Sequence, residues 1–165
     1  MAKKSKGSAG TPATVALAVA GIEHTVHTYD HDPRSASYGA EAAAALGLAE
    51  EQVFKTLLAD ADGRLVVAIV PVAGELDLKA LARTLGASRC AMADPARARR
   101  SSGYVVGGIS PIGQRKALPT VLDDSALAHP VVYVSGGRRG LDLGLAPTDL
   151  ARVTGAVTAP IRRTR

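Results

Sequence analysis

The stretch VFKTLLADADGRLVVAIVP, residues 53–71, contains two apolar segments on either side of the turn-forming residues Ala-Asp-Gly. Apolar segments of this length around a short glycine-containing connection are typical of a β-hairpin. We therefore expect strands over VFKTLLAD (53–60) and RLVVAIVP (64–71). The fold to which this hairpin belongs depends on the segments that flank it.

Outside the hairpin, helix and strand patterns alternate along the chain. A helix is expected where a capping residue or proline opens a segment and glycine closes it, as Thr11, Pro12 and Gly21 do for the first one. Helical patterns occupy residues 12–20, 40–48, 75–86, 94–102 and 146–155. Strand patterns occupy residues 23–29, 88–93, 104–108, 119–124 and 130–135, with 140–145 as a further candidate.

This order of elements predicts an α+β fold. Short helices between hairpin-like strands favour a mixed, mostly antiparallel sheet of about six to seven strands, or a partly closed barrel, with the helices packed outside. The 165 residues suit a single domain with one core. We expect the basic residues 1–10 to form a disordered tail ahead of a domain at 11–165.

Composition limits the classes of function. The chain is 47% hydrophobic and 21% charged, which is typical of a soluble globular protein. Aromatic residues make up only 3%, so we expect no surface on which they stack against single-stranded bases. The apolar run TVALAVAGI (14–22) is too short to span a membrane, and we see no signal peptide. With one cysteine, Cys90, the chain fits a reducing, cytoplasmic location without a membrane partner.

The formal net charge of +5 favours a polyanionic partner. Any one basic cluster by itself is more typical of solvated surface charge, but four clusters on one small domain strengthen the case for a partner. The clusters are Arg97, Arg99 and Arg100; Arg115 and Lys116; Arg138 and Arg139; and Arg162, Arg163 and Arg165.

Two strand segments contain candidates for chemistry. Lys55 shares a strand face with apolar neighbours, which is costly unless its amine is paired or reaches a pocket. The alternative is an edge-strand lysine that blocks aggregation or extends to water. In SGGRRGLDL (135–143), Ser135 lies at a strand end and Asp142 points away from the leucines beside it. The alternative there is a glycine-rich hairpin with a surface acid.

The loop GGISPIGQRKALP (107–119) contains more glycine and proline than a simple reversal needs. The backbone N–H groups of Gly107 and Gly108 could line an oxyanion or phosphate site. The loop matches no Walker or dinucleotide-binding motif, so an ordinary loop is the alternative.

We expect no metal and no cofactor. His24 and His27 project to opposite faces of a strand, and His31 lies in the loop beyond. Cys90 fits a small core residue better than a nucleophile, because its strand has no obvious activating partner.

Taken together, six segments closely resemble the YbaK-type Cys-tRNA(Pro) deacylases, of the wider family that includes the editing domain of bacterial prolyl-tRNA synthetases. The resemblance runs in order from about Thr11 to the last helix. The segments are HTYDHDP (27–33), QVFKTLL (52–58), VPVAGELDLK (70–79), MADP (92–95), GYVVGGISPIGQRK with LPT (103–120) and YVSGGRRGLDLGLAPTDL (133–150).

The resemblance implies an enzyme that hydrolyses the ester between a wrongly attached amino acid and the tRNA 3′ end. Carried over residue by residue, it implies catalytic residues Lys55 and Gly108 and substrate-binding residues Tyr29, Thr56, Ser135 and Asp142. The basic residues expected to bind tRNA are Arg115, Lys116, Arg138 and Arg139. Relatives often differ from the segment SASYG (35–39), which leaves the role of Tyr38 open.

The implied chemistry is substrate-assisted: the cysteinyl thiol attacks its own carbonyl and releases the tRNA as a thiolactone forms. Orientation alone can contribute about 7–11 kcal/mol to such a reaction, so no protein nucleophile is required. Lys55 would orient substrate oxygens, Asp142 would hold the α-ammonium and Gly108 would stabilise the oxyanion.

The alternatives are clearance of another small aminoacyl-tRNA, such as Ala-tRNA(Pro), and a non-catalytic module that binds tRNA or a synthetase. The expected partner is the acceptor end of mischarged tRNA, with prolyl-tRNA synthetase as a possible second partner.

Overall fold

The helices form where local signals place them. In this computed structural model, which describes residues 3–5, 10–35 and 37–164, Thr11 caps α1 (Pro12–Ala20) by accepting the N–H of Thr14 at 3.2 Å. Gly21 ends that helix with φ 67°, as the sequence predicts. The other four predicted helices are also confirmed, as α2 (Tyr38–Leu46), α3 (Leu78–Leu85), α4 (Pro95–Ser102) and α5 (Pro147–Thr154).

The predicted hairpin forms the middle of the larger sheet. Strands β3 (Phe54–Ala61) and β4 (Arg64–Pro71) pair antiparallel along their whole length, and the turn uses positive φ at Asp62 and Gly63. Three more strands complete the order β10-β7-β4-β3-β6, with β7 parallel to both of its neighbours. These are β6 (Cys90–Met92), β7 (Thr120–Asp123) and β10 (Val157–Ala159).

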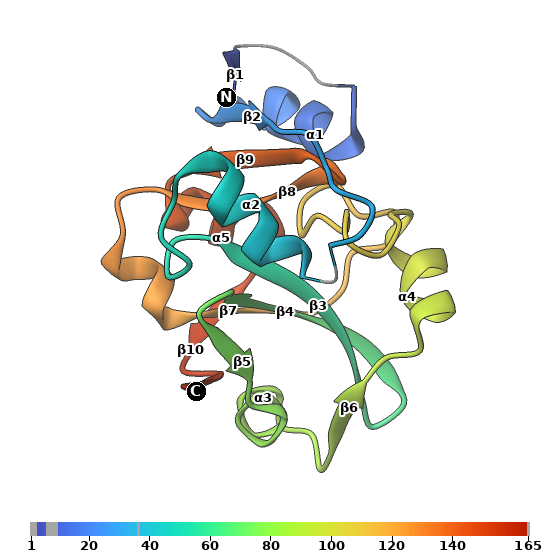
Figure 1. Ribbon diagram of the computed structural model, residues 1–165. Helices are drawn as coiled ribbons and strands as arrows, with labels where there is room; N and C mark the ends of the chain where they lie inside the picture. The colour runs from blue at the N-terminus through green and yellow to red at the C-terminus, as the bar shows by residue number, and fades with distance from the viewer. Residues whose placement is uncertain (1–2, 6–9, 36, 165) are drawn as a thin grey trace.

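A second, antiparallel sheet faces this one (Figure 1). Its order is β1-β2-β9-β8, from β1 (Lys3–Ser5), β2 (Thr25–Thr28), β9 (Leu141–Leu145) and β8 (Val132–Arg138). An isolated parallel bridge between Val53 and Tyr133 joins the sheets where β3 passes β8. A separate pair consists of β5 (Gly74–Leu76) and β11 (Arg162–Thr164).

The α+β class and the mostly antiparallel sheets are confirmed, but the strands do not close into a barrel. The short strands β1, β5, β10 and β11 raise the number of strands in the described residues above the predicted six to seven. Lys3–Ser5 pair with β2 although we expected a disordered tail over residues 1–10. The other residues of that tail, apart from Gly10, lie outside the described part of the chain.

The strand predicted at residues 104–108 is wrong, because this segment is a loop. Tyr104 is buried and its hydroxyl donates to the Ile112 carbonyl at 2.7 Å, while Val105 and Val106 are exposed. A turn then closes where the Gly108 N–H donates to the Val105 carbonyl. The segment therefore folds on itself instead of pairing with a sheet.

The largest core cluster joins the two sheets and α1. Leu17, Ile69, Leu122, Leu143 and Leu150 are fully buried in it. Aliphatic side chains thus fill the interior, as the composition requires. In the described residues, no helix has the length and apolar character needed to cross a membrane.

Candidate active site

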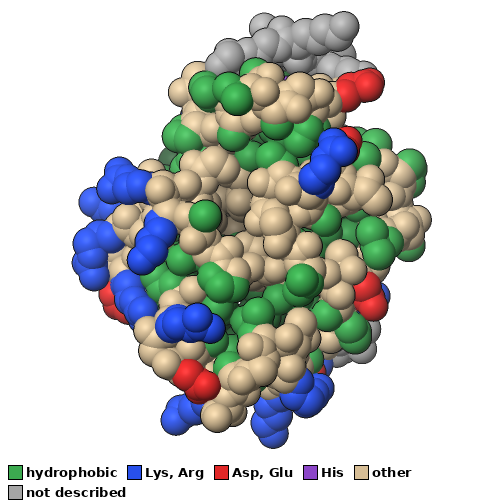
Figure 2. Space-filling view, turned by 180° about the vertical axis from the view of Figure 1, so that it is seen from behind, with side chains coloured by type: hydrophobic (Ala, Val, Ile, Leu, Met, Phe, Trp, Pro, Cys, Tyr) green, Lys and Arg blue, Asp and Glu red, His purple; other side chains and the backbone are tan. Residues whose placement is uncertain are grey.

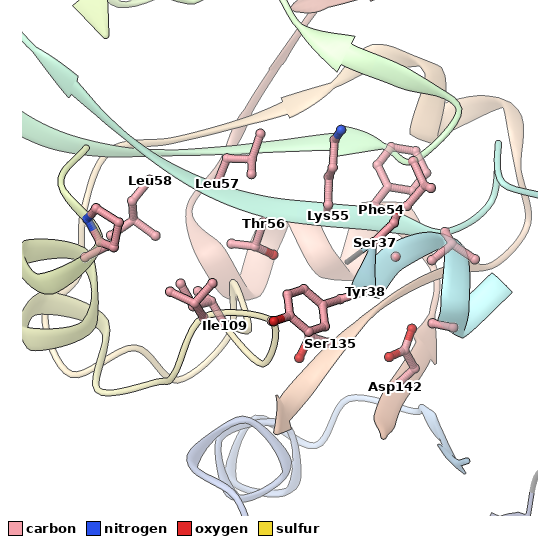
Figure 3. Close-up of a pocket in the computed structure, with 18 of the residues that line it drawn as sticks. Ser37, Tyr38, Phe54, Lys55, Thr56, Leu57, Leu58, Ile109, Ser135 and Asp142 are labelled. Atoms are coloured by element: carbon pink, nitrogen blue, oxygen red, sulfur yellow. The ribbon is translucent and has the colours of Figure 1, made fainter. Parts of the chain in front are cut away.

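A cavity of about 380 Å³ lies where the two sheets meet. Strand β3 forms one wall, the adjoining ends of β8 and β9 form another, and the start of α2, part of α4 and the loop after α4 complete it (Figure 3). Five of the six predicted catalytic and substrate-binding residues line it: Tyr29, Lys55, Thr56, Ser135 and Asp142.

Asp142 is the buried charge of the cavity. It is the second residue of β9, opposite His27 on one side and Ser135 on the other, and it is 5% exposed. Burial raises the pKa of its carboxyl group from 3.8 to about 7. A cationic group that entered the cavity would stabilise the carboxylate and lower this pKa again.

Tyr29 and Thr56, which both carry hydroxyl groups, line the same cavity. Burial, and next the charge of Asp142, raise the pKa of Tyr29 to about 12, so its phenol stays protonated at neutral pH. The Thr56 Oγ1 atom is buried and has no hydrogen-bond partner within the described residues. An unsatisfied buried hydroxyl is costly, and a polar group of a ligand would satisfy it.

Lys55 also lines the cavity, but from a different direction. Its side chain leaves β3 on the side opposite Thr56, and its amine points away from Asp142 (Figure 3). This follows from the alternation of side chains along a strand, which the sequence predicts for these two residues. The four-carbon stem of lysine can swing, so the amine can approach a substrate without a change in the backbone.

Ser135 is positioned by an irregularity in β8. The register with β9 shifts between Ser135 and Arg138, and the Ser135 hydroxyl accepts the N–H of Gly137 at 3.2 Å. Gly137 has φ 109°, and a Cβ atom there would lie 2.8 Å from the Tyr104 ring. The bulge therefore requires glycine, which explains the small residues after Ser135.

Gly108 lies behind the cavity wall, whereas its neighbours Gly107 and Ile109 line it. A Cβ atom at Gly108 would be 2.8 Å from the Arg138 Cα atom, so the loop packs directly on the end of β8. Its N–H donates to the Val105 carbonyl at 2.9 Å. The predicted oxyanion role of Gly108 stays a prediction, and it would require this turn to open.

Tyr38 lines the cavity, although sequence analysis left its role open. The Arg139 guanidinium lies 5.0 Å from the centre of the Tyr38 ring, and its Nη2 donates to the Val106 carbonyl at 2.7 Å. A Cβ atom at Gly107 would be 2.9 Å from the same ring. Tyr38 is thus held between the loop after α4 and the β8–β9 turn. In the sequence, the only sign of this position was the irregular segment that leads from the preceding loop into the helix.

The four residues predicted to bind tRNA fall in two places. Arg138 is the last residue of β8 and Arg139 follows it in the turn to β9; both are exposed, and Arg139 joins the rim of the cavity. Arg115 and Lys116 are exposed in the loop after α4. Their contact with tRNA stays a prediction.

Within the described residues, no three His, Cys, Asp or Glu side chains are grouped to hold a metal ion. The ring nitrogens of His24, His27 and His31 are engaged separately, with the Ile22 carbonyl, the Thr25 hydroxyl and the Glu41 carboxylate. Cys90 is buried away from the cavity, and burial raises the pKa of its thiol, which opposes formation of a nucleophilic thiolate.

Comparisons with known proteins identify relatives of this chain. Residues 32–153 match the family model described as "Aminoacyl-tRNA editing domain". The chain is 37% identical over 120 residues to the Enterococcus faecalis protein named "Putative Cys-tRNA(Pro)/Cys-tRNA(Cys) deacylase EbsC", which covers 72% of this chain and 73% of that protein. It is 36% identical over 100 residues to a proline–tRNA ligase of Moorella thermoacetica, covering 61% of this chain and 17% of the ligase.

A solved structure has the same fold over nearly the whole chain. It is described as a "putative trans-editing enzyme for prolyl tRNA synthetase", with a TM-score of 0.80 and 26% identity. The match covers 96% of this chain and 99% of that one. The chain therefore belongs to the family of aminoacyl-tRNA editing domains.

Proposed function

We propose that the protein is an aminoacyl-tRNA deacylase that clears mischarged tRNA, with Cys-tRNA(Pro) as its main substrate. The observation that carries this proposal is a cavity that holds a buried carboxylate and an unpartnered buried hydroxyl at the junction of the two sheets. The names of two relatives, a Cys-tRNA deacylase and a trans-editing enzyme, support the choice of reaction.

The cavity suits a small aminoacyl ester. Asp142 can accept the α-ammonium group, which relieves the cost of its own burial. Thr56 can donate to or accept from a polar group of the substrate. The apolar side chains around them, such as Phe54, Leu58 and Ile109, leave space for a short side chain in a volume of about 380 Å³.

The cysteinyl thiol acts as the nucleophile. Its sulfur forms a bond to the ester carbonyl carbon, the bond to the ribose oxygen breaks, and the thiol proton passes to that oxygen. Water then hydrolyses the thiolactone to free cysteine. The protein holds the thiol near the carbonyl, and Lys55 stabilises charge on the substrate oxygens.

The alternative substrate, Ala-tRNA(Pro), lacks the thiol and would need water as the nucleophile. The buried Asp142, with a pKa of about 7, is the residue that could assist water, so this alternative uses the same cavity. A module that only binds tRNA has no need of a cavity that fits the aminoacyl ester, which favours an enzyme.

A panel of charged tRNAs tests the proposal. The purified protein should deacylate Cys-tRNA(Pro) faster than Ala-, Ser- or Pro-tRNA(Pro). Comparison of the rates on Cys-tRNA(Cys) and Cys-tRNA(Pro) measures how strongly the protein discriminates between the two tRNAs. Fastest clearance of Ala-tRNA(Pro) would favour the alternative substrate, and a lack of deacylation throughout would contradict the enzyme. Because these substrates arise during translation, we also infer a cytoplasmic location, with prolyl-tRNA synthetase as a possible source of the substrate.

A further inference from the structure

A second cavity, of about 560 Å³, lies on the other side of α4 from the active-site cavity. Pro95 and Ala98 of α4 line the first cavity, whereas Arg97, Arg100 and Ser101 line the second. We call the second cavity the α4 groove. The turn between β3 and β4 and residues 116–119 form the rest of it.

The α4 groove is strongly basic. Its charged lining residues are Arg64, Arg97, Arg100 and Lys116, and it has no acidic lining residue. Figure 2 shows Lys and Arg side chains gathered along the edge of the molecule on which α4 lies. A concave site lined by one sign of charge concentrates the opposite charge, so the groove favours an anion.

The basic residues of the groove fall into two kinds. Arg97 pairs with Asp60 and its Nη2 donates to the Gly63 carbonyl at 2.9 Å, so it fastens α4 to the hairpin turn. Arg64, Arg100 and Lys116 are exposed, and within the described residues none of them forms an ion pair. Three cationic side chains are thus available to a ligand, whereas Arg97 holds α4 against the hairpin turn.

Ser101 supplies an independent sign of a ligand. Its Oγ atom is buried in the groove lining and has no hydrogen-bond partner within the described residues. A buried hydroxyl without a partner is costly, and an anionic oxygen in the groove would accept its hydrogen bond.

We propose that the α4 groove binds backbone phosphates of tRNA next to the aminoacylated 3′ end. This inference rests on the proposed function, because the ester occupies the cavity on the other face of α4. An α-helix with its side chains is about 10–12 Å thick, which a few nucleotides of RNA can span. The groove therefore positions the strand while the cavity reads the amino acid.

A double variant, Arg100→Ala with Lys116→Ala, tests the proposal. The matched control is Arg83→Ala with Lys79→Ala, which removes the same two residue types from exposed positions on α3. The affinity of each protein for uncharged tRNA(Pro) is measured by fluorescence anisotropy at several salt concentrations. Thermal unfolding of each variant checks that the fold is kept.

The groove variant should bind tRNA about tenfold more weakly than wild type, with a salt dependence shallower by about 1.4–1.8 in the log–log slope, as expected for two lost phosphate contacts. The control should keep most of the wild-type affinity for tRNA, so that its dissociation constant differs clearly from that of the groove variant. Equal effects of the two double variants, or no binding of tRNA by the wild-type protein, would overturn the proposal.

A second measurement separates this proposal from the proposed function. The ratio of kcat/KM on cysteinyl-tRNA(Pro) to that on cysteine esterified to adenosine should fall about tenfold in the groove variant and stay near wild type in the control. An unchanged ratio in the groove variant would overturn the groove as a phosphate site. A wild-type protein that cleaves neither ester would contradict the proposed function, while the binding measurement would still decide the role of the groove.

Discussion

Asp142 shows how a single residue can serve function at the expense of stability. Its pKa is 3.8 in an ordinary environment and about 7 in the folded protein, so the folded state binds a proton more tightly than the unfolded state. The free energy of unfolding therefore falls as pH rises from about 4 to 7, and the loss persists above pH 7. The full shift corresponds to about 4 kcal/mol as an upper bound.

Asp142→Asn should accordingly be more stable than the wild type at pH 8, by about 1–4 kcal/mol, and similar to it at pH 4. The same variant should lose most of its deacylation activity, because the α-ammonium loses its partner. Urea unfolding at both pH values and deacylation at pH 8 measure the two effects. A wild-type protein whose stability rises between pH 4 and 7 relative to the variant would contradict the buried carboxylate.

Lys55 is the positive charge among the lining residues of the cavity. Lys55→Ala should slow deacylation of Cys-tRNA(Pro) by on the order of 100-fold while the protein folds normally, because an electrostatic partner of the ester oxygens is lost. Lys79→Ala, at an exposed position on α3, is the control. A folded Lys55→Ala protein that works at the wild-type rate would remove Lys55 from the mechanism.

At the scale of elements, Tyr104 holds the loop that forms one wall of the cavity. Tyr104→Phe removes the hydroxyl that bonds the Ile112 carbonyl and should lower the free energy of unfolding by about 1–2 kcal/mol. Tyr133→Phe is the matched control, because the Tyr133 hydroxyl makes no hydrogen bond in the described part of the chain. Chemical denaturation of both variants measures the difference, and equal stabilities would show that this bond does not secure the loop.

The same loop shows where sequence patterns succeed and fail. Helices and the β3–β4 hairpin could be predicted because caps, prolines and glycines act locally. Val105 and Val106 suggest a strand, yet within the described residues they pair with no strand, and the segment closes a turn in which the Gly108 N–H donates to the Val105 carbonyl. Conversely, β10 and β11 have three residues each and exist through pairing with β7 and β5, which no local pattern reveals.

At the scale of the whole molecule, the cavity assembles residues that are far apart in the chain, between Tyr29 and Asp142. Spacing in the sequence could single out Lys55, Ser135 and Asp142, but it could not bring them together. The resemblance to editing domains assigned these residues to one site by analogy. Neither approach could place Gly108 behind the wall or Tyr38 beneath Arg139, because both depend on how the loop packs on the β8–β9 turn.

The most direct test of the central claim compares cysteinyl-tRNA(Pro) with S-methylcysteinyl-tRNA(Pro) as substrates of the wild-type protein. S-methylation removes the nucleophile and adds one methyl group to the contents of the cavity. We predict rapid release of tRNA from the first, with a thiolactone that a fast amine quench traps. Release from the second should be at least 100-fold slower, which uses only part of the about 7–11 kcal/mol that orientation of a reacting group can supply. Equal rates on the two substrates would contradict substrate-assisted chemistry and indicate that water attacks the ester.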